Sequence, residues 1–316
     1  MYDSGAGTKR QTKRRSKIAE TLGHIGFAVS AIFVVLLLIL VYYFVGSQSF
    51  QTFTQSHISL GDFFASSNWD AQNHLGISYF IIGSLSLVVL SLLFAVPISL
   101  GVAVFISEIA PRWLKYPLLR AIELFLGIPS VIFGLFGLIV IVPLVRNFLN
   151  LIAGGIFYNG YGLVPAAIVV TFMILPTVST IAYDAMQAVP RELREGSYAL
   201  GSSRRQTISR VLIPAAGPGI MTGIILGIAR ALGETVAVAF VIGNSQHLPF
   251  GISPYFPYIY IGPTSVLTTQ LLFNFKEATV GSPLYNALWT ISFVLLIISG
   301  ILVAVSRFFV SKRVYS

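Results

Sequence analysis

Six long apolar runs constrain this chain more than any other feature of its sequence. Each run reaches the ~20 residues that an α-helix needs to cross the hydrocarbon core of a bilayer. The first also exceeds the roughly 7 to 15 apolar residues of a secretory signal, so we expect it to remain as a membrane helix. The chain is therefore predicted to be an all-α integral membrane protein with six transmembrane helices. The runs cover residues 25–45, 77–106, 121–145, 163–186, 215–243 and 284–309.

The composition agrees with a lipid environment. Hydrophobic residues make up 55% of the 316 residues and charged residues only 10%, whereas roughly a quarter of an ordinary globular domain is charged. Such a chain lacks the polar surface to be a soluble domain. The net charge of +9 does not indicate nucleic acid, because the basic residues flank the apolar runs instead of forming one patch.

The positions of the basic residues predict the orientation. Six of the 20 Lys and Arg residues lie between Lys9 and Lys17, and most others fall in the 108–120 loop, the 187–213 loop and the C-terminal end. Cytoplasmic segments carry such an excess of positive charge. We therefore expect both termini to be cytoplasmic in a cell membrane protein with a basic N-terminal segment (1–24), a six-helix transmembrane domain (25–310) and a short tail (311–316).

Two segments are expected to be external loops. Residues 46–76 are rich in Ser, Asn and Gln, and residues 244–283 carry several prolines among Tyr and Phe. Aromatic rings with polar tips settle near lipid headgroups, so we expect the second loop to lie there.

The residue types exclude several chemistries. The chain has no Cys, and its four His residues show no ligand-like spacing, which predicts no metal site and no cofactor. It contains no Gly-Lys pair and hence no Walker A loop to hold ATP phosphates. A membrane enzyme is disfavoured because no nucleophile, metal cluster or catalytic carboxylate pair is visible.

The 187–213 loop carries the clearest local signals. Pro190 suits the start of a helix and Gly201 suits the residue just after a helix end. We expect one short helix over 191–200 and a second over about 203–213. Two short charged helices joined at a glycine would form a compact surface for a cytoplasmic partner.

This loop resembles the EAA motif of ABC importer permeases. The motif residues fall on Glu195, Gly201, Val211, Ile213 and Pro214, with Gly and Ser replacing the two alanines after the glutamate and Ile replacing a leucine. The resemblance implies a type I ABC importer permease fold in which the loop (about 190–213) inserts into a groove on an ATPase subunit. The residues assigned to this coupling are Arg194, Glu195, Ala199, Gly201 and Pro214. A segment resting on the membrane surface is the alternative, but it would not require Gly201 and Pro214 at fixed offsets.

The fifth run contains a charged pair. Arg230 is the only Arg inside a span, and Glu234 follows four residues later, one helical turn away, where the two side chains can pair. One interpretation is a structural ion pair. The other is an oxyanion site, because a guanidinium donates paired hydrogen bonds to phosphate oxygens. Arg230, Glu234 and Thr235 are the candidate residues of the substrate path.

A stripe of small residues follows the same span, one at every fourth position. Small residues let helix backbones approach closely, and packing alone explains the stripe. Its members are Gly219, Gly223, Gly227, Ala231, Thr235, Ala239 and Gly243.

The segment from Arg230 to Asn244 (RALGETVAVAFVIGN) resembles the PstC family, a membrane subunit of the high-affinity phosphate importer. Residues 66–70, 122–130 and 188–195 add to the similarity, which covers nearly the whole chain after about residue 25. The resemblance implies transport of inorganic phosphate by alternating access. It also implies as partners a sister permease of PstA type, an ATPase dimer of PstB type, a phosphate-binding protein of PstS type outside, and membrane lipid.

Two other functions remain open at this level. The permease could carry another oxyanion such as molybdate or sulfate, and a binding assay with its receptor would separate these substrates. A self-contained secondary transporter or channel would instead need no partner ATPase.

Overall fold

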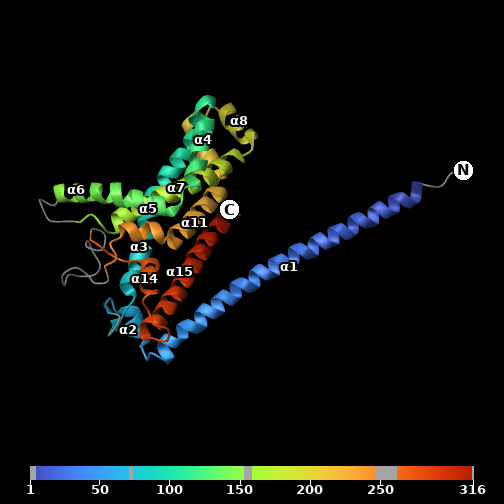
Figure 1. The fold of residues 1–316 in the computed structure, drawn as a ribbon. Coiled ribbons are helices and arrows are strands. Elements are labelled where there is room, and N and C mark those ends of the chain that lie inside the picture. The colour runs from blue at the N-terminus through green and yellow to red at the C-terminus, as the bar shows by residue number, and fades with distance from the viewer. Residues whose placement is uncertain (1–4, 71–73, 153–158, 246–261, 315–316) are drawn as a thin grey trace.

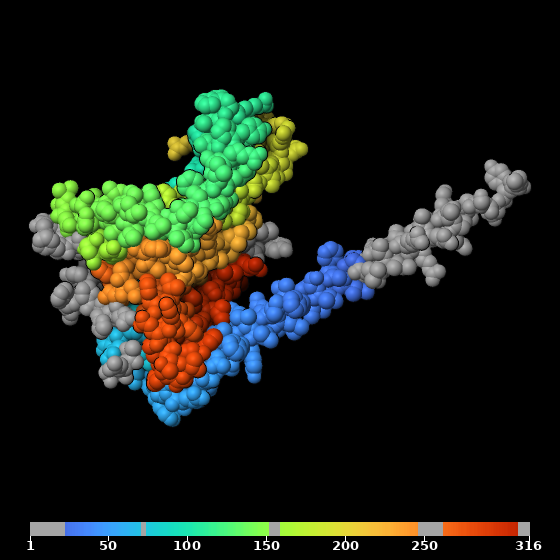
Figure 2. All heavy atoms as spheres, viewed as in Figure 1, coloured from blue at the N-terminus to red at the C-terminus, as the bar shows by residue number. Residues whose placement is uncertain are grey.

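The computed structural model describes residues 5–70, 74–152, 159–245 and 262–314, and this part of the chain is almost entirely helical. Helix α1 (Gly5–Thr54) stands apart from the other helices along much of its length (Figures 1 and 2). Only its C-terminal part lies beside α15 (Pro283–Val314). There the Tyr42 hydroxyl donates to the Leu296 carbonyl oxygen at 3.3 Å, and the Thr52 and Thr290 hydroxyls lie 2.7 Å apart.

The centre of the bundle consists of α3 (Ser78–Val104), α7 (Leu163–Gln187) and α11 (Gly217–Gly233), which pack along one another. Most of the α7 side chains are buried. Hydroxyls join α3 and α7, since Ser99 Oγ donates to the Leu175 carbonyl and Thr171 Oγ1 to the Ser91 carbonyl. These bonds satisfy polar groups that would be costly in an apolar interior.

Five helices of the described chain are long and apolar enough to span a membrane, and a bent helix pair raises the number to six. The prediction of six spans is thus reproduced, with changes in their limits. The first helix begins at Gly5 and the last ends at Val314, so both are longer than the apolar runs.

The limits predicted for the third span are wrong. The predicted 108–120 loop and the beginning of the 121–145 run contain instead a separate helix, α4 (Arg112–Leu126), with no buried residue. Gly127 and Pro129 interrupt the helix, because proline disfavours helical geometry in the residue before it. The span begins at Ser130 and runs through α5 (Ser130–Phe136), a π-helical turn η2 (Gly137–Ile141) and α6 (Val142–Ile152).

The fifth span, predicted as one helix over 215–243, is broken. The helical segment Arg204–Ala215, which leads into this span, meets helix α11 at 68°. Helix α11 then ends at Gly233, Glu234 has an extended backbone with ψ of 120°, and α12 (Val236–Val241) follows. Gly217 and Pro218 favour the bend, and Gly233 the break, because glycine weakens helices and proline lacks an N–H donor.

Both segments predicted as external loops contain regular secondary structure. Residues 46–76 contain the end of α1, helix α2 (Leu60–Ala65) and an antiparallel hairpin of β1 (Trp69–Asp70) and β2 (His74–Leu75). The second loop contains α14 (Leu267–Asn274). The expectation that 244–283 lies near headgroups concerns mainly residues 246–261, which are outside the described residues.

Candidate functional site

The predicted two-helix loop forms one end of the bundle. Helix α8 (Arg191–Ala199) follows directly after Pro190, and Ser203 caps α9 (Arg204–Thr207), which continues into the π-helical turn η3 (Ile208–Leu212) and α10 (Ile213–Ala215). Gly201 joins the two halves with φ of +78°. This left-handed conformation is the one that glycine adopts without strain, so the local prediction agrees with the structure.

Helix α8 and the residue that follows it carry exposed apolar side chains that the sequence analysis missed. Leu200 is 89% exposed, and Leu193 and Tyr198 are each 47% exposed. They lie beside the exposed Glu195 and Ala199, and Figure 1 shows α8 projecting with α4 at one end of the molecule. Exposed apolar groups amid charge are typical of a docking surface. The seven-residue spacing of Leu193 and Leu200 was the available signal.

The inner face of α8 is tied to the bundle. Ser197 Oγ lies 3.0 Å from Thr207 Oγ1 in a buried contact with α9. Arg194 turns inward as well, with its Nη1 atom 3.3 Å from Oε1 of Glu108 and its Nη2 donating to the Met186 carbonyl at 2.7 Å. Arg194 is therefore separated from the exposed Glu195, although both are candidate coupling residues. Pro214, the last of that set, is exposed on α10.

The candidate substrate residues flank the break in the fifth span. Arg230 is partly buried near the end of α11, and its Nη1 donates to Oγ1 of Thr177 on α7 at 3.2 Å. Glu234 accepts the N–H of Ala237 at 3.0 Å and thereby caps α12. Its carbonyl oxygen accepts from the Thr268 hydroxyl at 3.2 Å.

The predicted contact between Arg230 and Glu234 is absent. The ion pairs within 4.0 Å among the described residues do not include one between them. The prediction assumed a helix that continues through Glu234, but the extended backbone there turns the carboxylate towards α12. The Arg230 guanidinium is left with a neutral hydroxyl as its described partner.

Thr235 lies at the same break. It occupies the residue before α12, is partly buried, and donates from its hydroxyl to the Gly233 carbonyl at 3.2 Å. Non-helical backbone at membrane depth is tolerated where it is buried in protein or lines a water-filled cavity. Arg230, Glu234 and Thr235 therefore collect at a polar interruption of an apolar span, next to Thr177 and Thr268, which the sequence analysis did not identify.

The small-residue stripe brings α11 against α7. A Cβ atom added at Gly223 would lie 3.2 Å from Ile181 Cβ, and one added at Gly227 would lie 3.0 Å from Val178. The stripe therefore serves helix packing, as expected. This close packing holds α11 beside the helix that carries Thr177.

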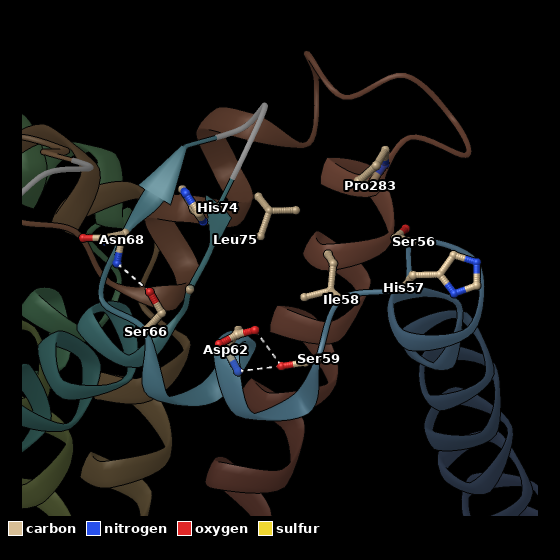
Figure 3. A pocket seen from close by; sticks show the side chains of 11 residues that line it. Ser56, His57, Ile58, Ser59, Asp62, Ser66, Asn68, His74, Leu75 and Pro283 are labelled. Carbon is tan, nitrogen blue, oxygen red and sulfur yellow. Dashed lines mark hydrogen bonds between the residues drawn. The ribbon is translucent and has the colours of Figure 1, made fainter.

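A polar pocket of about 610 Å³ lies at the opposite end of the bundle, beside α2 (Figure 3). Its lining includes His57, Asp62, Asn68 and His74. Ser59 donates to the Asp62 carboxylate at 2.8 Å and accepts the Asp62 N–H at 3.0 Å, which fixes the start of α2.

Known transport proteins are similar to this chain in sequence. Residues 95–314 match the family described as the binding-protein-dependent transport system inner membrane component. The chain is 38% identical to the probable ABC transporter permease protein YqgH of Bacillus subtilis, over 96% of this chain and 94% of that protein. It is 35% identical to the phosphate transport system permease protein PstC of Pasteurella multocida, over 89% and 88% of the two chains.

Solved structures agree in fold. A bacterial ABC transporter involved in the import of the acidic polysaccharide alginate has a chain that superposes with a TM-score of 0.63, at 16% identity, covering 94% of this chain and 99% of that one. At this identity the likeness concerns the fold alone.

Proposed function

Because this chain belongs to the binding-protein-dependent transport system inner membrane component family, as an ABC importer permease, we propose that it carries inorganic phosphate across the cell membrane. Relatives of 34% to 35% identity are named phosphate transport system permease protein PstC. The proposed role is that of the non-catalytic membrane subunit, with ATP hydrolysis in a partner.

The substrate assignment rests on the contacts of the Arg230 guanidinium. Its guanidinium contacts the neutral Thr177 hydroxyl, and no carboxylate among the described residues lies within ion-pair distance of it. A charged Arg at mid-membrane costs ~2.5 to 3.5 kcal/mol even on the lenient insertion scale. A partly buried guanidinium without a counter-ion favours transient binding of an anionic substrate. The planar fork of its N–H donors matches two phosphate oxygens.

Glu234 and Thr235 complete the proposed path. Glu234 holds the start of α12 through Ala237 and offers a carboxylate close to the break. A carboxylate can accept the proton that phosphate, unlike sulfate, still carries near neutrality, and it weakens the attraction so that the anion is released. Thr235 adds a hydroxyl next to Glu234, at the same break in the fifth span.

The proposed partners follow from the two ends of the bundle. Glu195, Ala199 and the exposed Leu200 on and after α8 would dock a PstB-type ATPase dimer on the cytoplasmic side, with both termini on that side. The end with α2 would then face a PstS-type phosphate-binding protein. A PstA-type permease would complete the heterodimer, and each permease would supply half of an alternating-access gate.

Uptake of labelled phosphate by the complex reconstituted with its ATPase, sister permease and receptor in lipid vesicles tests this function. We expect ATP-dependent uptake that unlabelled phosphate suppresses. Absence of labelled-phosphate uptake, with ATP-dependent uptake of labelled molybdate or sulfate by the same complex, would instead assign another oxyanion. Uptake without the ATPase would indicate a secondary transporter.

A further inference from the structure

The cytoplasmic assignment of α8 leaves open how movement of this helix reaches the membrane spans. Helix α8 packs mainly on η3 and α9. A pocket of about 350 Å³ lies between its first turn and the start of α11, lined by Leu193, Ala215 and Pro218 among others. Apolar packing therefore joins α8 only loosely to α11.

The polar link to α3 is close and largely shielded from solvent. Glu108 lies in the π-helical turn η1 (Phe105–Ile109), which continues α3. Its carboxylate lies 3.3 Å from Nη1 of Arg194, and the two side chains are 10% and 23% exposed. Shielded charge pairs are screened much less by salt than surface pairs are.

Neighbouring groups hold this carboxylate in place. The Ser107 hydroxyl donates to Glu108 Oε1 at 2.8 Å, and Gln187 at the end of α7 donates from Nε2 to the Ser107 hydroxyl at 2.9 Å. The second nitrogen of the Arg194 fork donates to the Met186 carbonyl, also at the end of α7. One arginine on α8 thus binds the ends of α3 and α7 together.

We propose that the Glu108–Arg194 ion pair is the link through which movement of α8 is transmitted to α3. Helix α7 is joined to α8 by the chain itself, through Ala188, Val189 and Pro190, whereas α3 has no covalent connection to α8 nearby. Arg194 and Glu108 are positioning residues that act through helices and do not contact substrate. The arginine fork presents a separate nitrogen to each acceptor, Glu108 and the Met186 carbonyl, whereas a lysine would have to serve both from one flexible ammonium group.

This inference rests on the proposed function, and its test uses the complete reconstituted complex. The variants Glu108→Gln and Arg194→Gln remove one charge each, and Arg194→Lys keeps the charge without the fork. We expect both Gln variants to copurify with the ATPase while phosphate uptake per ATP hydrolysed falls on the order of tenfold, the effect of losing one charged hydrogen bond. Uptake per ATP in Arg194→Lys should lie between the values of the Gln variants and that of the unchanged chain.

A matched control pair is available on α4. Arg120 and Glu123 form an ion pair of 2.8 Å, but their side chains are 80% and 55% exposed. Exposed pairs contribute little, so Arg120→Gln and Glu123→Gln should leave uptake per ATP unchanged. An equal loss in these controls, or a normal ratio in both Gln variants of the buried pair, overturns the proposal.

A second readout does not depend on phosphate. Spin labels on cysteines at Glu192 in α8 and Leu93 in α3, both exposed, report the distance between the two helices in a chain that has no native Cys. We expect the distance to stay the same with and without ATP in the unchanged chain and to change with ATP in Glu108→Gln. A distance that responds to ATP alike in both chains overturns the link, whereas absent phosphate uptake with the expected distances overturns only the substrate.

Discussion

The guanidinium of Arg230 on α11 donates a hydrogen bond to the hydroxyl of Thr177 on α7, at 3.2 Å. The residue that sequence spacing paired with Arg230, Glu234, instead caps the next helix through the Ala237 N–H. The two side chains therefore have separate hydrogen-bond partners and form no ion pair within 4.0 Å. Their separate roles can be tested one at a time.

Replacing Arg230 should abolish transport without unfolding the protein. Arg230→Gln should lower phosphate uptake at least about tenfold, because a charged hydrogen-bond donor to the anion is lost. Arg230→Lys should keep part of the activity, since a point charge still attracts phosphate. Uptake by vesicles containing the assembled complex measures this, with Arg146→Gln, an exposed basic residue, as a control that should transport normally.

The double variant Arg230→Gln with Glu234→Gln separates a substrate site from a structural ion pair. An ion pair replaced by two amides can be nearly neutral, which would restore uptake, whereas an anion site stays inactive. Because the two side chains do not pair here, we expect the double variant to remain inactive. Normal uptake would identify Arg230 as a packing residue.

Glu234 should have two separable roles. In Glu234→Gln the side-chain oxygen can still accept the Ala237 N–H, so the thermal stability of the complex should be retained, whereas uptake should fall because the carboxylate charge is lost. Glu234→Ala should in addition lose the cap, which costs about 1 kcal/mol. Unfolding temperature and uptake, measured on the same preparations, distinguish the effects. Equal destabilisation by both changes would contradict the capping role.

Gly201 should be required for its backbone conformation. A side chain there would meet open space, so any cost of Gly201→Leu comes from φ of +78°, roughly 1 to 2 kcal/mol. We expect altered geometry between α8 and α9, and hydrolysis of ATP without uptake. Gly196→Ala is the control, because Gly196 lies within α8, also faces open space, and alanine favours a helix. It should transport normally.

The apolar surface of α8 should bind the ATPase. Leu200→Ser should reduce copurification of the ATPase subunit, because this side chain is 89% exposed in the isolated chain and gains from burial about 1.5 to 3 kcal/mol. Val280→Ser is the control, since Val280 is also exposed, at 80%, but belongs to another region. Unchanged copurification in Leu200→Ser would remove this surface from the interface.

The two ends of the bundle should lie on opposite sides of the membrane. Single cysteines at Gln55 and Ser203, both exposed, can be labelled with an impermeant thiol reagent in this Cys-free chain. We expect Gln55 to react from outside the cell and Ser203 only after the membrane is opened. Reaction of both from one side would contradict the topology.

Local properties of the chain were predicted well from the sequence. Hydropathy is a sum over neighbouring residues, so the number of spans followed from the apolar runs. The two short helices joined at Gly201 followed from proline and glycine, whose backbone preferences act within a few residues. The predicted limits of the third span were wrong because hydropathy is averaged over the apolar run and does not register the helix break at Gly127 and Pro129.

The contacts of the candidate sites were decided only by tertiary structure. Whether Arg230 meets Glu234 depended on a helix break, and its partner Thr177 lies 53 residues away along the chain. Arg194, predicted with Glu195 as one coupling surface, meets Glu108 on another helix instead. Spacing within a helix specifies which residues share a face, whereas which helix that face meets depends on the packing of the whole bundle.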